Sequence, residues 1–161
     1  MNEFFLTISI SKPLGKSRFN VFEKKSNSVL LLEQIQQERL HVFYDMIKEK
    51  AHDKRKVFFI YGGTDTEARE EARKLMEHEE DAICIASFGV FSTGINIPSI
   101  ENVIFASPSK SRIRNLQSIG RGLRQATGKD KATLYDIADD LRYKKRMNFT
   151  LQHFVERAKI Y

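Results

Sequence analysis

The chain has 161 residues, of which 41% are hydrophobic and 11% aromatic, and its 27 Lys and Arg exceed its 21 Asp and Glu, giving a formal net charge of +6. A chain of this length buries roughly 68–70% of the surface that it exposes when unfolded. The composition therefore excludes intrinsic disorder as a description of the chain and predicts one folded domain.

Two further observations narrow the class of protein. Cys84 is the single cysteine, which excludes an internal disulfide and a cysteine-based zinc site, and we expect no metal ligands in this chain. No apolar stretch approaches the ~20 residues needed to cross a bilayer, and the N-terminus lacks the basic start of a secretory signal. We therefore expect a cytoplasmic protein without a membrane partner.

The first 27 residues fit the strand and helix pattern of the chain less well than the rest. We treat them as an N-terminal extension before a domain of residues 28–161. Residues 4–10 are predicted as a possible edge strand. The polar segment after them contains Gly15, Lys16 and Ser17, which match the last three positions of a phosphate-binding loop. Ile10 stands where that motif has its first glycine, so we expect no such loop here.

From residue 28 onward, short apolar runs rich in Val, Ile and Phe alternate with longer segments of helical periodicity. Apolar runs without alternating polar residues are typical of parallel strands buried on both faces. The predicted strands are residues 28–32, 57–61, 82–86, 103–106 and 132–137, and the predicted helices are residues 35–51, 66–77, 111–123 and 147–159. With right-handed crossovers this order predicts a three-layer α/β/α domain with a mainly parallel sheet.

The first predicted helix carries an apolar stripe that we expect to pack against the core. The stripe consists of Ile35, Leu40, Phe43 and Ile47, and in part of Val42 and Met46. The last predicted strand ends in the acids Asp136, Asp139 and Asp140, as do strands that hold Mg²⁺ in nucleotide hydrolases. Without a phosphate-binding loop to serve, these acids are predicted to be solvated in a turn.

The positive charge is concentrated between Asn102 and Lys129, where no acid occurs. The six bases of this window equal the net charge of the whole chain. They are Lys110, Arg112, Arg114, Arg121, Arg124 and Lys129. Such a window indicates an anionic partner, either phosphate or nucleic acid, and the alternative is a solvated basic loop.

Within this window, Gln117, Arg121 and Arg124 are spaced by four and three residues, which predicts that they share one helical face. Gly120 and Gly122 lie beside them, although each costs on the order of 1 kcal/mol relative to Ala in a helix. Their presence predicts close approach by a ligand or by another backbone. The alternative is an exposed basic helix whose spacing is accidental.

In their order along the chain, these motifs resemble the second RecA-like lobe of superfamily 2 helicases, and particularly bacteriophage recombination and repair helicases of the UvsW type. The segments that carry the resemblance are Tyr61-Gly62-Gly63 with Arg69 downstream, residues 83–87, residues 93–98 and residues 117–124. The resemblance covers about residues 27–161. It implies a P-loop NTPase fold and the C-terminal motor lobe of an ATP-dependent nucleic-acid helicase or translocase.

The resemblance also implies roles for residues near ATP. Arg124 would be the arginine finger, Arg121 its partner on the γ-phosphate, and Gln117 would lie near the phosphate and the attacking water. Gly94, Asn96 and Gly120 would lie by the nucleotide. ATP with Mg²⁺ would be held mainly by a first lobe that is absent from this sequence, in cis or in trans.

A second set of residues would face nucleic acid, DNA rather than RNA. These are Gly62, Gly63, Ser87, Phe88, Thr93 and Lys110. Backbone N–H groups and hydroxyls would contact the nucleic-acid backbone without base specificity. Lys110, Arg112, Arg114 and Lys129 would remain as positive charge for nucleic acid or for the first lobe.

This sequence departs from the family pattern at two positions, with Asn96 where Asp is usual and Ser118 where Arg is frequent. Two alternatives also stay open. One is a stand-alone nucleic-acid-binding or regulatory module without ATPase activity, and the weaker one is a flavodoxin-like domain for a small ligand. If the chain is phage-encoded, the expected compartment is the cytoplasm of the bacterial host.

Overall fold

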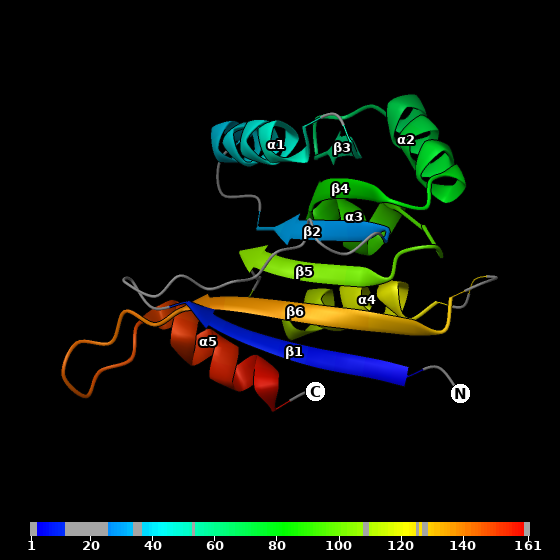
Figure 1. Cartoon of the computed structure of the whole chain (residues 1–161). Helices are drawn as coiled ribbons and strands as arrows, with labels where there is room; N and C mark the ends of the chain where they lie inside the picture. Colours follow the sequence, from blue (N-terminus) through cyan, green and yellow to red (C-terminus); the bar gives the residue numbers. More distant parts are fainter. Residues whose placement is uncertain are drawn as a thin grey trace.

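A computed structural model describes residues 3–11, 26–33, 37–52, 54–107, 110–124, 126 and 129–159. These parts of the chain form one sheet and the helices around it (Figure 1). In chain order the elements are β1 (Glu3–Ser11), β2 (Ser28–Leu32), α1 (Gln37–Ala51), β3 (Lys56–Ile60), α2 (Thr66–His78), β4 (Ala82–Ser87), α3 (Phe88–Gly94), β5 (Asn102–Ser107), α4 (Arg112–Gly122), β6 (Lys131–Asp139) and α5 (Phe149–Ala158).

The sheet has six strands in the order β1-β6-β5-β2-β4-β3, and each strand runs parallel to its neighbours. The predicted α/β fold with a mainly parallel sheet is confirmed. Because the strands are parallel, their carboxyl ends lie along one edge of the sheet, which we name the carboxyl edge. Their amino ends lie along the opposite edge, the amino edge.

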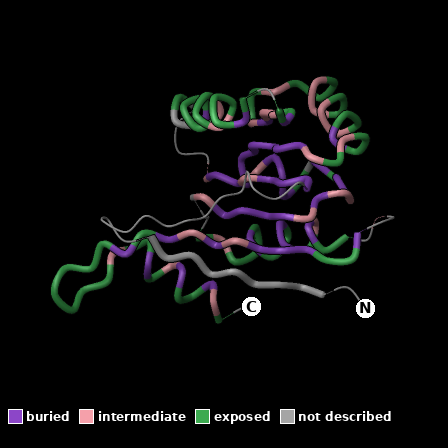
Figure 2. Tube along the Cα trace, viewed as in Figure 1, coloured by how far each residue is buried: buried purple, intermediate pink, exposed green. Residues whose placement is uncertain are grey.

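The central strands are buried on both faces, which explains their uninterrupted apolar sequences. All six residues of β4 are buried, and the tube in Figure 2 shows the same burial through the middle of the sheet. β2 coincides with the predicted strand at residues 28–32. β1 forms the edge strand predicted for residues 4–10 and pairs with β6. The Gly15-Lys16-Ser17 segment lies outside the described residues.

The helices cover the two faces of the sheet unequally. On one face, α2, α3 and α4 contribute Met76, Phe91 and Ile119 to a cluster that includes Cys84 of β4. On the other face, α1 packs through Leu40 against apolar residues of the strands, and together they form a second cluster. α5 packs against the end of β6. Within the described parts of the chain, α1 is alone on its face.

Two helices differ from the pattern expected from the sequence. α3 has no counterpart among the predicted helices, because seven residues with two glycines give a weak helical signal. The predicted stripe of α1 is correct at Leu40 and Ile47 and wrong at Val42, Phe43 and Met46, which are 57%, 38% and 50% exposed. The packed positions are Leu40, Tyr44 and Ile47, which recur at helical spacing and meet strands of the second cluster.

Candidate functional site

Arg121, in the last turn of α4, joins two segments that are far apart in the sequence. Its guanidinium donates to the carbonyl oxygen of Ser92 at 3.0 Å and to that of Ile95. Ser92 lies in α3 and Ile95 is its C-cap, so Arg121 pairs carbonyls that the end of a helix leaves free. Burial, with a smaller effect of the Arg124 charge, lowers the pKa of Arg121.

Arg124 does not share a helical face with Arg121, contrary to the prediction. α4 ends at Gly122, and Leu123 is its C-cap. Arg124 follows, and its backbone N–H donates to the Arg121 carbonyl at 3.3 Å. The Arg124 side chain is exposed, yet its charge acts on Arg121. Among the described residues neither arginine has an acidic partner. The two positive charges therefore lie near each other without a carboxylate to neutralise them.

Lys129 fixes the segment that carries these arginines. Its Nζ donates to the carbonyl oxygens of Gly122 at 2.5 Å, Arg124 at 2.9 Å and Pro98 at 3.1 Å. The residue is 8% exposed. Burial lowers the pKa of Lys129 to about 8, against the opposing effect of Glu101. The expectation that Lys129 is free for nucleic acid is therefore wrong.

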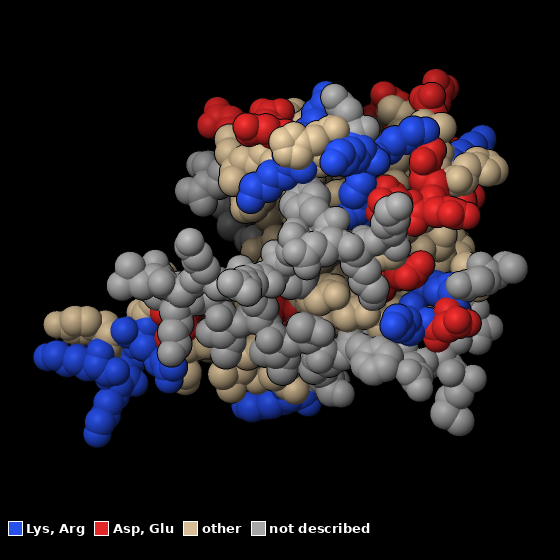
Figure 3. Space-filling view, viewed as in Figure 1, with Lys and Arg blue, Asp and Glu red and all other residues tan. Residues whose placement is uncertain are grey.

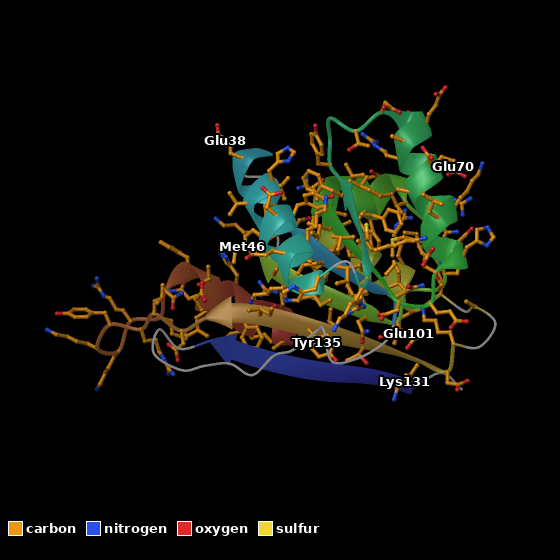
Figure 4. The ribbon with its side chains drawn as sticks, turned by 45° about the horizontal axis from the view of Figure 1, so that its top comes forward. Glu38, Met46, Glu70, Glu101, Lys131 and Tyr135 are labelled. Carbon is orange, nitrogen blue, oxygen red and sulfur yellow. The ribbon has the colours of Figure 1, made fainter. Side chains whose placement is uncertain are left out.

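Lys129 lies at the amino edge of the sheet, where two segments of the chain meet. In Figure 4, Glu101 and Lys131 are labelled at the end of the sheet where β5 and β6 begin. The loop that precedes β5 and the turn that follows α4 both end at this edge. Lys129 holds these two segments together, because Pro98 belongs to the first and Arg124 to the second.

The two glycines of α4 have different surroundings. A Cβ on Gly122 would overlap Cγ2 of Val103, so this glycine allows α4 to pack on β5. A Cβ on Gly120 would meet nothing within 4 Å. Close approach by another backbone element is therefore found at Gly122, whereas the surface over Gly120 is open to an external group.

The other residues expected near ATP lie around this junction of α3 and α4. Gln117 is exposed one turn before Arg121, and Asn96 is exposed directly after Ile95. Gly94 is the last residue of α3. Thr93, expected to face nucleic acid, is also exposed here, in the last turn of α3, and its hydroxyl donates to the Gly89 carbonyl at 2.7 Å.

The remaining residues expected to contact nucleic acid lie along the carboxyl edge. Gly62 and Gly63 follow β3 and are exposed, and the Gly62 carbonyl accepts a hydrogen bond from Arg69 at 3.0 Å. Ser87 ends the neighbouring strand β4, and Phe88 begins α3. Both residues are fully buried, backbone included, so the structure does not expose them for such a contact.

Lys110 lies at the same edge, after β5, and borders a pocket of about 370 Å³ between the start of α4 and α5. The described residues that line the pocket are Lys110, Arg112, Asn115, His153, Glu156, Arg157 and Lys159. Burial lowers the pKa of His153, and the charges of Lys110 and Arg157 lower it further. The pocket therefore has a positive potential.

Of the three acids at the end of β6 that are predicted to be solvated, Asp139 is exposed, whereas Asp136 and Asp140 are buried. Asp136 is 0% exposed and accepts two hydrogen bonds from Arg157, at 2.7 and 2.8 Å. Asp140 is buried and accepts from Arg142 at 2.5 and 2.8 Å. These pairs join residues that no sequence motif links. In the described ranges, no group of three His, Cys, Asp or Glu is placed to hold a metal ion, and no helix is long and apolar enough to cross a membrane.

A known protein family matches the part of the sequence that forms this junction of α3 and α4. Residues 16–126 match the family described as "Helicase conserved C-terminal domain", which is more than half of the chain. The chain belongs to this helicase C-terminal domain family. Two motifs meet at the junction of α3 and α4, Thr93 to Pro98 and Gln117 to Arg124. Both lie within the matched residues.

Individual relatives of this helicase domain agree with the assignment. The chain is 31% identical, over 94% of its length, to the "ATP-dependent DNA helicase uvsW" of Enterobacteria phage T4, and it covers 31% of that protein. The crystal structure of T4 UvsW matches with a TM-score of 0.65 over 86% of this chain and 29% of that chain. The chain thus spans about a third of the length of this relative.

The fold extends to more distant helicase domains. The C-terminal domain of the DEAD-box protein Dbp5 matches with a TM-score of 0.63 at 14% identity, over 84% of this chain and 69% of that chain. At this identity the likeness shows the fold alone. The predicted helicase C-terminal lobe, with its mostly parallel sheet, is confirmed.

Proposed function

We propose that this chain is the C-terminal motor lobe of an ATP-dependent helicase or translocase and that Arg124 and Arg121 act on the γ-phosphate of ATP bound to a first RecA-like lobe. Residues 28–161 form this lobe, and the first lobe is supplied in cis or in trans. The observation that carries the proposal is a pair of arginines at the junction of α3 and α4, one half-buried (Arg121) and one exposed (Arg124), without an acidic partner among the described residues.

The chemistry of phosphoryl transfer supports these roles. ATP with Mg²⁺ supplies the free energy of the reaction, and the protein has to position groups and neutralise charge that develops on the phosphoryl oxygens. Arginine suits this task because its planar fork pairs two oxygens at once. Gln117 and Asn96 would line the same surface, and the open space over Gly120 fits a close phosphate or ribose.

The nucleic-acid contact is proposed at the carboxyl edge, through the exposed residues Gly62, Gly63 and Lys110. We favour DNA over RNA because the T4 relative is named as a DNA helicase. We place the protein in the cytoplasm, which is that of the bacterial host if a phage encodes it. The alternative is a stand-alone nucleic-acid-binding or regulatory module without ATPase activity.

Substitution of Arg124 tests the proposal in a protein that contains both lobes. Arg124→Ala is expected to lower ATP turnover by about 10³-fold or more, because a supplied arginine finger is worth 10³ to 10⁵ in rate. Nucleotide binding, measured with a fluorescent ATP analogue, should persist.

Lys74→Ala is the matched control, since Lys74 is an exposed cation on α2 away from the junction of α3 and α4. Near-normal turnover by Arg124→Ala would overturn the assignment of Arg124. The stand-alone module would be supported if the first lobe, added in excess, leaves this chain without ATP turnover.

A further inference from the structure

A basic hairpin projects from the domain between β6 and α5. It comprises residues 141–148 together with Phe149, the first residue of α5, and is drawn in orange at the lower left of Figure 1. In Figure 3 its Lys and Arg side chains form a blue cluster that extends beyond the body of the molecule. The family match ends at residue 126, so the hairpin lies outside the matched helicase region.

The tip of the hairpin has a defined backbone. Tyr143 and Arg146 form an antiparallel bridge, with N–H to carbonyl distances of 3.1 and 3.0 Å. Lys144 lies in the left-handed region with φ of 54°, a conformation that glycine adopts more easily than lysine. Such strained positions are concentrated at functional sites, where another requirement fixes the side chain.

The base of the hairpin is anchored to the end of β6. Asn148 donates to the Asp139 carbonyl at 2.9 Å, and its Oδ1 accepts from the N–H of Leu141 at 3.0 Å. Arg142 pairs with Asp140, so the charge of this arginine is neutralised locally. The hairpin is therefore held in one orientation by both of its ends.

Three cations remain at the tip. Within the described residues, Lys144, Lys145 and Arg146 have no acidic partner, and all three are exposed. The Lys144 ammonium lies 5.5 Å from the centre of the Tyr143 ring. This contact keeps a cation and an aromatic face side by side at the end of the projection.

The hairpin also exposes apolar surface that the domain does not bury. Tyr143 is 73% exposed and Phe149 is 76% exposed. Leu141 and Met147, on the two sides of the same hairpin, are 56% and 41% exposed. Aromatic rings interleaved with unpaired cations are the surface that single-stranded nucleic acid requires, because bases stack on the rings and phosphates pair with the cations.

We propose that the basic hairpin binds single-stranded nucleic acid, with Tyr143 stacked on a base and Lys144, Lys145 and Arg146 on the adjacent phosphates. This inference rests on the proposed function, which brings nucleic acid to the domain. Asp139, at the base of the hairpin, lines a second pocket that shares His153 and Arg157 with the basic pocket at Lys110. The proposed contact of nucleic acid with the hairpin is therefore continuous with the one proposed at the carboxyl edge.

Binding of a fluorescein-labelled single-stranded DNA 12-mer to the full chain, measured by anisotropy at several KCl concentrations, tests the hairpin. Removal of three phosphate contacts in Lys144→Ala/Lys145→Ala/Arg146→Ala is expected to reduce the log–log salt slope by about 2, at about 0.7 per phosphate. Tyr143→Leu should weaken binding about 5- to 150-fold, and Tyr143→Phe should not.

The control is Lys48→Ala/Lys50→Ala/Lys54→Ala, which removes the same charge from exposed positions on and just after α1. Thermal unfolding verifies that each variant is folded. The proposal is overturned if the wild-type chain binds no DNA, if both triple variants behave alike, or if Tyr143→Leu binds as tightly as Tyr143→Phe. It is also overturned if the hairpin instead binds anionic phosphatidylserine vesicles.

The two proposals fail in different experiments. Normal ATP turnover by Arg124→Ala would end the assignment of the arginine finger and leave the hairpin result unchanged. Equal DNA binding by the hairpin variants and the wild type would end the hairpin inference in a protein that still binds DNA.

Discussion

Lys129 shows how a single residue can support a site without belonging to it. Its ammonium group connects the carbonyls of Gly122 and Arg124 with that of Pro98. A buried charge that is well hydrogen-bonded is costly to remove, because its partners are left without donors. The residue therefore contributes to the position of Arg124 through the backbone.

Lys129→Met keeps the volume and removes the three donated hydrogen bonds. We expect this variant to lose about 2–4 kcal/mol of unfolding free energy, because one buried and two partly buried hydrogen bonds lose their donor. Urea unfolding followed by circular dichroism measures the loss. Lys131→Met, an exposed lysine on the neighbouring strand, is the control and should change little.

The same residue predicts a dependence of stability on pH. Burial lowers the pKa of Lys129 to about 8 in the folded chain, whereas the ordinary value is 10.5. Between these values the unfolded chain binds more protons, so the contribution of Lys129 to the unfolding free energy rises with pH. Below pH 8 both states are protonated and the contribution is constant.

Subtracting the urea unfolding free energies of Lys129→Met from those of the wild type isolates this contribution. The difference is expected to grow from pH 8 toward pH 10. A difference that stays flat, or shrinks, would show that the pKa of Lys129 is not lowered by folding.

At the scale of one element, α4 has a packed glycine and an open glycine. Gly122→Ala is expected to destabilise the fold by about 1–3 kcal/mol, because the added methyl group overlaps Val103. Gly120→Ala meets no atom and should leave stability unchanged or raise it by up to about 1 kcal/mol. Thermal unfolding of both variants measures the contrast.

The ATPase activity of the same two variants separates packing from ligand approach. In a two-lobe protein, Gly120→Ala should lower ATP turnover although it does not destabilise the fold. Full turnover by a stable Gly120→Ala variant would remove Gly120 from the nucleotide site.

The sequence predicts most elements here, and its errors have physical causes. Parallel strands were recognisable because burial on both faces requires uninterrupted apolar residues, as in β4. α3 was missed because a seven-residue helix is stabilised by tertiary packing of Phe88 and Phe91 rather than by local propensity. Arg124 was placed on a helix because periodicity does not reveal that α4 ends at Gly122.

At the scale of the whole molecule, the missed features are contacts between distant residues. The pair of Asp136 with Arg157 joins β6 to α5, and the three carbonyls on Lys129 join two loops. Neither has a sequence spacing that identifies it. The basic hairpin did have a signal, four bases within residues 142–146, which a charge count centred on residues 102–129 leaves out.

The direct passage from β4 into α3 has a mechanical consequence. α3 begins at Phe88 on the carboxyl edge and ends beside the carbonyls that Arg121 holds. Its seven residues make a rod about 10 Å long at 1.5 Å per residue. If Arg121 moves toward a phosphate, as proposed, it pulls on one end of this rod while the other end is fixed to the strand. A movement at the proposed nucleotide surface would then reach the carboxyl edge through α3.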